Sequence, residues 1–252
     1  MKKFIHFLLS LPKSIYLNFK VFSLKTAIKL PIIVDYRTIM HGLYKGCFML
    51  DFEEQKYFGC VKLGWGNGSL GNSCNSNNYI IIHGKGHFIF KSGGAIIARG
   101  MTLRSDNNGC VVFGKKFCAN QNFSVFTNTK ITFGDNCVLG WNVNVRDSDG
   151  HPIKDASGNL INPNKQIYIG NHVWIASHVD ILKGCFIPDG CVLGFKSLVT
   201  SKFNDENCII AGIPANLCDD RASCHDCIKF YFKNYIYTYI GCAVFGLKWS
   251  FY

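Results

Sequence analysis

The most regular hydrophobic pattern in the chain has a period of six and runs from Ile169 to Thr200. Successive hexads are led by Ile169, Ile175, Ile181, Ile187, Leu193 and Val199. Because 48% of the residues are apolar, such a run in one phase would arise by chance about once in a hundred trials. Four positions after the first five leaders stand the small or β-branched residues Val173, Val179, Cys185, Cys191 and Ser197. An α-helix would show a period near 3.6 and a flat strand a period near 2, so we predict a parallel β-helix of triangular coils.

Three hexads make one coil of about 18 residues, and the leaders of neighbouring coils should therefore stack. We expect Ile169 to lie against Ile187, and the following leaders to pair in the same way. Upstream, a six-residue phase is kept by Phe113, Ala119, Val125 and Ile131. The pattern then continues two residues out of step in Phe133, Leu139 and Val145, which predicts a small insertion at a corner. We expect this all-β solenoid to occupy residues 80–216.

The repeat is interrupted between Val145 and Ile169. Residues 146–167 are rich in Gly, Pro, Asp and Asn, which favour turns over strands. We therefore predict an inserted loop over 146–167. Loops of this length in a compact repeat fold usually carry function.

The N-terminal segment, residues 1–79, is predicted to hold a helix and irregular lead-in strands. Residues 1–30 form an amphipathic helix pattern whose apolar positions are Phe4, Leu8, Leu11, Ile15, Phe19 and Phe22. This helix either packs on the neighbouring domain or rests its lysine-rich edge on an anionic membrane.

The C-terminal tail, residues 217–252, is dense in aromatic residues. It either covers a face of the β-helix or helps to hold the chain at a bilayer interface, where aromatic rings accumulate. No segment reaches the roughly 20 apolar residues that span a bilayer as a helix. We expect a cytoplasmic protein that makes peripheral contact with the inner membrane face.

The chain of 252 residues has a net charge of +11, which suits a phosphorylated cofactor, an anionic glycan or a membrane surface. We expect no nucleic-acid partner, because no interleaved basic and aromatic motif or zinc-finger spacing occurs. The thirteen cysteines are predicted to be reduced thiols, since several occupy small corner positions of the repeat. We also predict no metal. His172 and His178 are six residues apart and should lie on different faces, and Cys224-x-x-Cys227 lacks a second matched pair.

The loop opens with Asp147-Ser-Asp149-Gly-His151-Pro. A histidine beside carboxylates can hold one tautomer and exchange protons near neutral pH, so His151 is a candidate general base. The alternative is an ordinary solvent-exposed histidine beside a turn.

The chain resembles the hexapeptide-repeat acyltransferases, particularly the maltose and galactoside O-acetyltransferases and the capsule or lipopolysaccharide O-acetyltransferases. The matching elements are Asp147-x-Asp-Gly-His, Ile169-Gly-Asn-His-Val-Trp-Ile-Ala-Ser, Ile181-Leu-Lys-Gly, Gly194-Phe-Lys-Ser-Leu-Val-Thr and Ala211-Gly-Ile-Pro-Ala. The resemblance covers about residues 110–216. It implies a left-handed β-helix, an acetyl-CoA donor, a homotrimer and an active site between neighbouring subunits.

Carried over by position, the resemblance gives catalytic roles to His151, Asp149 and Asp147. It gives acceptor-binding roles to Asn120 and Asn128, and acetyl-CoA contacts to Trp174, Ala176, Ser177, Gly194, Thr200 and Lys202. The sequence departs from the family at Asn128, where an Asp is frequent, and at Asn216, where a basic residue is frequent. We expect an O-acetyltransferase acting on a surface-polysaccharide sugar or its precursor. The alternatives are N-acylation of an amino sugar and a non-catalytic β-helix scaffold.

Overall fold

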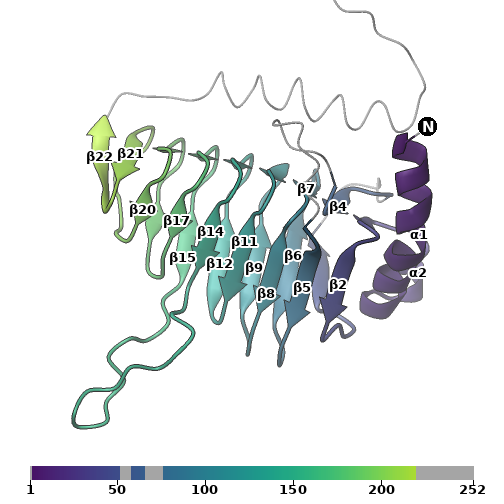
Figure 1. Cartoon of the computed structure of the whole chain (residues 1–252), viewed down its shortest axis with the longest axis horizontal. Coiled ribbons are helices and arrows are strands. Elements are labelled where there is room, and N and C mark those ends of the chain that lie inside the picture. The colour runs from purple at the N-terminus through teal and green to yellow at the C-terminus, as the bar shows by residue number, and fades with distance from the viewer. Residues whose placement is uncertain (1, 52–57, 66–75, 220–252) are drawn as a thin grey trace, which may run out of the picture.

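The computed structural model describes residues 2–51, 58–65 and 76–219, which form a prism of stacked triangular coils (Figure 1). Sheet A contains β1 (Ile32–Val34), β4 (Val61–Leu63), β7 (Ala95–Ile97), β10 (Phe117–Ala119), β13 (Val138–Leu139), β16 (Trp174–Ile175), β19 (Val192–Leu193), β21 (Ile209–Gly212) and β22 (Ala215–Asp219). Sheet B contains β2 (Thr38–His41), β5 (Asn78–Ile82), β8 (Thr102–Ser105), β11 (Ser124–Thr127), β14 (Asn144–Arg146), β17 (Asp180–Ile181) and β20 (Leu198–Val199). Sheet C contains β3 (Phe48–Asp51), β6 (His87–Lys91), β9 (Cys110–Phe113), β12 (Lys130–Phe133), β15 (Ile167–Ile169) and β18 (Phe186–Ile187). This is the predicted left-handed parallel β-helix.

The hexad leaders fill the interior of the prism, as the period of six predicts. All six leaders from Ile169 to Val199 are fully buried. Ile169 pairs in register with Ile187, and Ile175 pairs with Leu193. The small residues at the corner positions are buried as well, because the coil turns most tightly there. Side chains of one inward position therefore form a continuous column along the prism axis.

The coils near the N-terminus are wider than the later ones. Phe113 pairs with Phe133, two positions beyond Ile131, and the additional residues form the turn between β11 and β12. The predicted corner insertion is thereby confirmed. Aromatic rings fill the wider interior: Phe90 stacks on Phe113 at 4.8 Å, and Phe113 stacks on Phe133 at 5.8 Å.

The solenoid starts earlier than the predicted residue 80. Strand β1 pairs in parallel with β4, and β2 pairs in parallel with β5, so these strands belong to the same three sheets. Val34 pairs with Leu63 across this first coil, which is far longer than 18 residues. Such irregular coil lengths hide the period of six in the sequence. At the other end, β21 adds a parallel strand, and β22 closes the sheet in antiparallel fashion.

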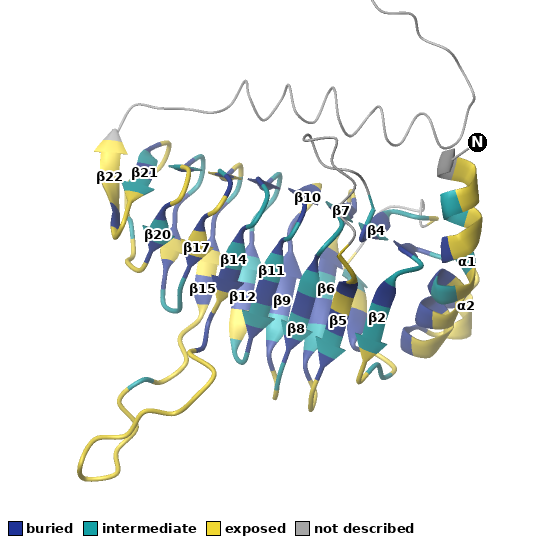
Figure 2. Cartoon of the chain, viewed as in Figure 1, coloured by how far each residue is buried: buried dark blue, intermediate teal, exposed yellow. Residues whose placement is uncertain are grey.

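The N-terminal helical prediction is confirmed as two helices, α1 (Lys2–Val21) and α2 (Leu24–Ala27). Helix α1 covers the first coil and crosses the prism axis (Figure 1). It buries polar Ser10, Ser14 and Asn18, while Phe4 and Leu8 are exposed (Figure 2). The side of α1 that packs on the first coil is therefore largely polar, although the hydrophobic pattern alone would predict that the apolar side is buried.

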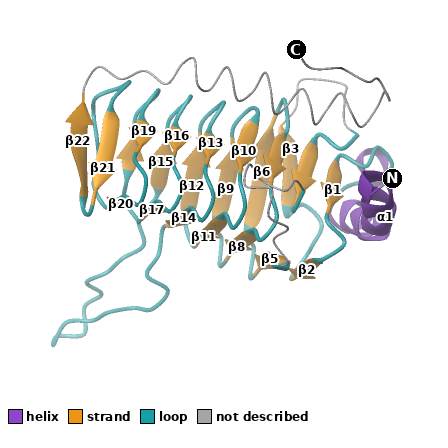
Figure 3. Cartoon of the chain, turned by 45° about the horizontal axis from the view of Figure 1, so that its top comes forward, coloured by secondary structure: helices purple, strands orange, loops and turns teal. Residues whose placement is uncertain are grey.

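The inserted loop leaves the prism between β14 and β15 and projects away from the coils (Figure 3). Among the described residues, no helix is long and apolar enough to cross a membrane. The predicted roles of tail residues 220–252 and of the Cys224–Cys227 cluster concern residues outside those described.

Candidate functional site

Two edges of the prism carry the residues predicted to form the site. The A/B edge joins the end of each sheet A strand to the next sheet B strand. The B/C edge joins sheet B to sheet C in the same way, and the inserted loop leaves from it.

Asp147 braces the B/C edge from inside. Its side chain is fully buried directly after β14. One carboxylate oxygen accepts hydrogen bonds from the hydroxyls of Thr127 and Thr129, each at 2.7 Å, and from the Thr129 backbone N–H at 2.9 Å. The other accepts the Asn128 backbone N–H at 2.7 Å. These four bonds hold the corner insertion, so the geometry gives Asp147 a positioning role.

Asn128, a predicted acceptor-binding residue, sits on this turn. Its side-chain oxygen accepts a hydrogen bond from the Asn107 amide at 2.7 Å. The turn therefore presents Asn128 at the base of the loop, with its orientation fixed from the preceding coil.

Asp149 closes the base of the loop together with Lys183 and Asn162. The Lys183 ammonium donates to Asp149 Oδ2 at 2.5 Å and to the Asn162 carbonyl at 3.1 Å. The Asn162 amide donates to Asp149 Oδ2 at 2.9 Å and to the His151 carbonyl at 2.8 Å. The hydrogen bond from Lys183 holds the pKa of Asp149 below its usual range. Sequence reasoning missed Lys183 and Asn162 because their partners lie far along the chain.

His151 is fixed through its backbone while its ring is exposed. Across the described ranges, no hydrogen bond joins the ring to Asp147 or Asp149, so the predicted carboxylate pairing is not seen. An exposed imidazole at the end of a braced loop base can meet an acceptor hydroxyl from solvent.

The A/B edge carries the predicted cofactor contacts. Trp174 begins β16 on the outer face of sheet A and is 37% exposed. Ser177 follows at the corner and is buried; its hydroxyl accepts the Trp141 backbone N–H at 3.1 Å, and its carbonyl accepts the Lys196 N–H at 3.1 Å. Half-buried Ala176 donates its N–H to Leu193 at 2.9 Å. Trp174 therefore offers the only large open side-chain surface among the three.

Gly194 serves the stacking of coils at this edge. A Cβ atom on Gly194 would lie 2.6 Å from the Ala211 side chain. A side chain there would force two coils apart. The close contact between coils is therefore sufficient to explain why position 194 is a glycine, and no cofactor contact is needed.

Asn120, the other predicted acceptor residue, also lies on the A/B edge, directly after β10. It is 8% exposed, and its amide donates to the Leu139 carbonyl at 3.1 Å. It is therefore held against the next coil.

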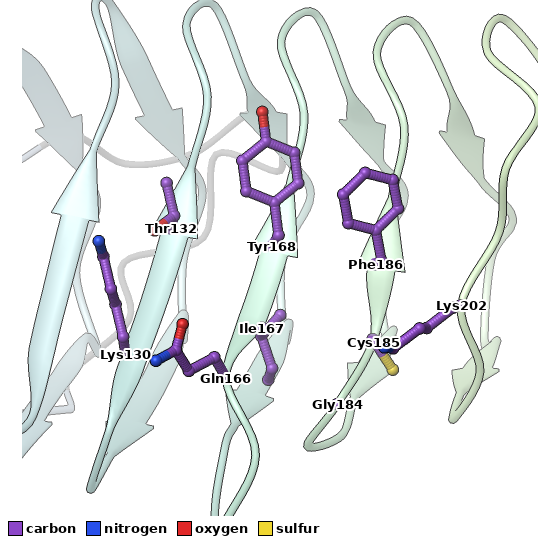
Figure 4. Close-up of a pocket in the computed structure, with 9 residues that line it drawn as sticks. All are labelled: Lys130, Thr132, Gln166, Ile167, Tyr168, Gly184, Cys185, Phe186 and Lys202. Atoms are coloured by element: carbon purple, nitrogen blue, oxygen red, sulfur yellow. The ribbon is translucent and has the colours of Figure 1, made fainter.

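Thr200 and Lys202 follow β20 on the B/C edge, and both are exposed. Lys202 lines an open depression of about 360 Å³ on the outer face of sheet C (Figure 4). Lys130, Tyr168 and Phe186 line it too, and the two aromatic rings stack at 5.0 Å. Sequence reasoning missed these rings because they occupy outward positions between the hexad leaders.

The predicted site residues thus form two groups in one chain. Asn120, Trp174, Ala176, Ser177 and Gly194 belong to the A/B side, and Asn128, Asp147, Asp149, His151, Thr200 and Lys202 belong to the B/C edge. Sheet B lies between the two edges, and its width is roughly 15 Å at about 3.3 Å per extended residue. One chain alone does not bring the two groups together.

The histidines considered for a metal lie at different edges, as predicted. His172 stands between β15 and β16, on the edge that joins sheets C and A, whereas His178 stands between β16 and β17, on the A/B edge. Buried thiols face the core: burial raises the pKa of Cys137 to about 12 and that of Cys185 to about 11. These cysteines are therefore protonated packing residues at neutral pH.

No family model matches the chain. The sequence is 34% identical to the galactoside O-acetyltransferase of Escherichia coli K12 over 130 residues, which cover 48% of this chain and 59% of that protein. It is 35% identical to the polysialic acid O-acetyltransferase of Escherichia coli O1:K1 over 109 residues, which cover 42% of this chain and 35% of that protein. The chain therefore spans less than two thirds of these curated relatives.

Solved structures with a similar fold include the polysialic-acid-specific acetyltransferase NeuO. That comparison gives a TM-score of 0.47 at 23% identity and covers 85% of this chain and 99% of that one. By sequence, this chain is therefore similar over part of its length to galactoside and polysialic acid O-acetyltransferases.

Proposed function

We propose that this protein transfers an acetyl group from acetyl-CoA to a hydroxyl of a surface-polysaccharide sugar or of its precursor. The observation that carries this proposal is the loop base, where Asp149, Lys183 and Asn162 brace the backbone of His151 and leave its ring open. The similarity to galactoside and polysialic acid O-acetyltransferases supports the reaction class.

In the proposed reaction, the His151 imidazole takes the proton from the acceptor hydroxyl as its oxygen attacks the thioester carbon. A tetrahedral oxyanion forms and collapses, which breaks the carbon–sulfur bond. The proton held by the imidazolium then passes to the departing CoA sulfur, so the base is regenerated. Hydrogen-bond donors around the acyl carbon stabilise the oxyanion.

The acetyl-CoA donor would lie along the A/B edge. The exposed face of Trp174 can contact the pantetheine arm, and the exposed Lys196 on the same edge can meet a phosphate group. Thr200 and Lys202 lie on the B/C edge, so they would reach the donor only from a neighbouring copy of the chain. Asn120 and Asn128 would position the acceptor.

We also propose a homotrimer, because the two groups of site residues lie on opposite edges of sheet B. In a closed three-fold ring, the A/B edge of one copy can meet the B/C edge of the next. Sheet B would then face the axis, and each site would take His151 from one subunit and Trp174 from another.

Mixed trimers test the shared site. His151→Ala and Trp174→Ala chains should each be nearly inactive alone. Trimers assembled from an equal mixture of the two variants should regain about a quarter of the wild-type number of active sites. In about that share of subunit interfaces, random assembly places an intact His151 from one variant beside an intact Trp174 from the other. If the mixed trimers show no more activity than each variant alone, the site is not shared between subunits.

The acceptor is tested by mass spectrometry of the surface glycan with and without the gene. Loss of one acetyl unit per modified sugar, released by mild alkali, supports O-acetylation. An alkali-stable acetyl group would instead support N-acylation of an amino sugar, and an unchanged glycan would support the scaffold alternative.

For location, we propose a cytoplasmic protein with peripheral contact to the inner membrane face. The net charge of +11 supports an anionic surface as one of its partners.

A further inference from the structure

Helix α1 contacts the first coil through a polar stripe. The Asn18 amide donates to the Ile32 carbonyl at 2.7 Å, and its oxygen accepts the Ile32 N–H at 3.2 Å. Ser14 accepts the Val34 N–H at 3.0 Å. Because β1 is the edge strand of sheet A, these side chains pair backbone groups that would otherwise form an open sheet edge.

Further contacts fix the rotation of α1 about its axis. Leu17 and Val21 are buried beside the polar stripe. The His6 ring lies 3.1 Å from the buried carboxylate of Asp35, and the Lys13 ammonium donates to the Thr38 carbonyl at 2.8 Å. The helix is therefore held along most of its length, and its other side must face outward.

The outward side of α1 is apolar. It exposes 41–65% of each of the large side chains Phe4, Ile5, Leu8, Leu9, Ile15, Tyr16 and Phe19. Leu24 and Ile28, at the two ends of the adjoining helix α2, are also exposed, by 69% and 63%. Figure 2 shows the exposed strip on the side of α1 away from the coils. A contiguous apolar surface of this kind marks an interaction site.

The charged residues of the segment that carries this surface are all positive. Residues 1–34 contain six lysines and no Asp or Glu. Lys20, Lys25 and Lys29 are exposed at its border, and the next acidic residue, Asp35, is buried under α1. An apolar helix face bordered by lysines matches an anionic lipid surface, in which such helices lie parallel to the membrane plane.

We propose that the outer face of α1 and Leu24–Ile28 is a lipid-docking surface that inserts into an anionic bilayer. Phe4, Leu8 and Phe19 would enter the acyl boundary, while the bordering lysines would meet the headgroups. This proposal deepens the peripheral membrane contact proposed above and names the surface responsible. The polar stripe stays bonded to β1, so α1 lies on the membrane and the prism stands upright on it.

This orientation sets the height of the site. His151 leaves the prism after β14, the fifth strand of sheet B. Four strand spacings of about 4.8 Å place it about 20 Å above the first coil. The helix adds about 10 Å, so the base would work about 30 Å from the bilayer. Together with the proposed transferase activity, this favours a lipid-linked glycan whose acetylated sugar lies several units from its anchor.

Vesicle flotation of the full chain tests the docking surface. We expect flotation with vesicles containing phosphatidylglycerol and little flotation with phosphatidylcholine alone. The double variant Leu8→Ser/Phe19→Ser should reduce the bound fraction by about tenfold or more, because it removes the inserted side chains. The matched control Leu160→Ser/Ile161→Ser changes two exposed apolar residues of the inserted loop and should float like the wild type.

A charge variant provides a second measurement should the apolar double variant misfold. Lys20→Glu/Lys25→Glu/Lys29→Glu should also lose binding to anionic vesicles, and the loss should be largest at low salt. The proposal is overturned if the wild type does not bind anionic vesicles, or if the outer-face variants bind as well as it does. It is also overturned if those variants change the oligomeric mass, since the face would then contact another copy.

Activity separates this proposal from the transferase proposal. The Leu8→Ser/Phe19→Ser variant should acetylate a soluble acceptor at the wild-type rate and lose rate only on an acceptor carried by vesicles. An inactive wild type that still floats would refute the transferase function and leave the docking surface supported.

Discussion

The residues at the base of the inserted loop differ in what holds them. Asp147 is buried under four hydrogen bonds, Asp149 is exposed but paired with Lys183, and the His151 ring is open to solvent. Three residues within five positions should therefore respond differently to substitution.

We expect His151→Ala to lower kcat for acetyl transfer by about 10²–10⁴ without changing the melting temperature, because the open ring contributes to proton transfer rather than to packing. Steady-state kinetics and thermal unfolding on the same preparation measure both effects. His87→Ala, on sheet C and remote from the loop, is the matched control. A loss below tenfold would contradict the assignment of His151 as the base.

Asp147→Asn should instead destabilise the fold, by about 3 kcal/mol. The amide would turn an N–H₂ group toward backbone and hydroxyl donors, which leaves buried donors without acceptors. Chemical denaturation gives the free energy of unfolding. The exposed Asp205→Asn, between β20 and β21, is the control and should change it by less than about 0.5 kcal/mol. Equal effects of the two substitutions would rule out the bracing role.

The Asp149–Lys183 pair predicts a specific pH dependence. Its hydrogen bond lowers the pKa of Asp149, so the stabilisation is complete above the ordinary Asp pKa of 3.8 and is lost as pH falls through the lower folded value. Lys183→Met should raise the pKa of Asp149 toward 3.8, measured by NMR titration of its carboxyl carbon. Lys154→Met, in the same loop, should leave that pKa unchanged; a shift with Lys154→Met alone would contradict the pairing.

At the element scale, the interaction of α1 with β1 is polar where helix packing is usually apolar. Asn18→Leu should therefore destabilise the protein by about 2–4 kcal/mol although leucine favours helices, because the Ile32 N–H and C=O would lose their partners. Differential scanning calorimetry measures the effect. Exposed Lys20→Ala is the control and should stay within about 0.5 kcal/mol of the wild type. If Asn18→Leu instead stabilised the protein, water would have to satisfy the Ile32 N–H and C=O in place of the Asn18 side chain.

At the scale of the whole molecule, the separation of the two site groups across sheet B predicts an assembly. Light scattering should give a mass of about three times 28.3 kDa. A fully active monomer would contradict a site shared between subunits. The depression with Tyr168, Phe186 and Lys202 lies on the outer sheet C and would remain open in such a ring.

The sequence by itself determined the coil and much of its register. Packing inside a narrow prism admits one large inward residue and one small corner residue every six positions, so the period alone assigns the leaders from Ile169 to Val199 to the core. The same periodicity located the loop, because a run of Gly, Pro and Asp residues cannot continue it. The candidate His151 followed from its place at the start of that interruption.

Tertiary structure alone decided which polar groups meet. Asp147 contacts a turn 20 residues earlier, and Asp149 pairs with Lys183 34 residues later, separations at which local sequence carries no signal. The early coils were missed because their unequal lengths remove the period. The rotation of α1 was likewise beyond the sequence: hydrophobicity favours burying Phe4 and Leu8, but the unpaired backbone of β1 selects Ser14 and Asn18, since an open strand edge needs hydrogen-bonding partners more than apolar contact.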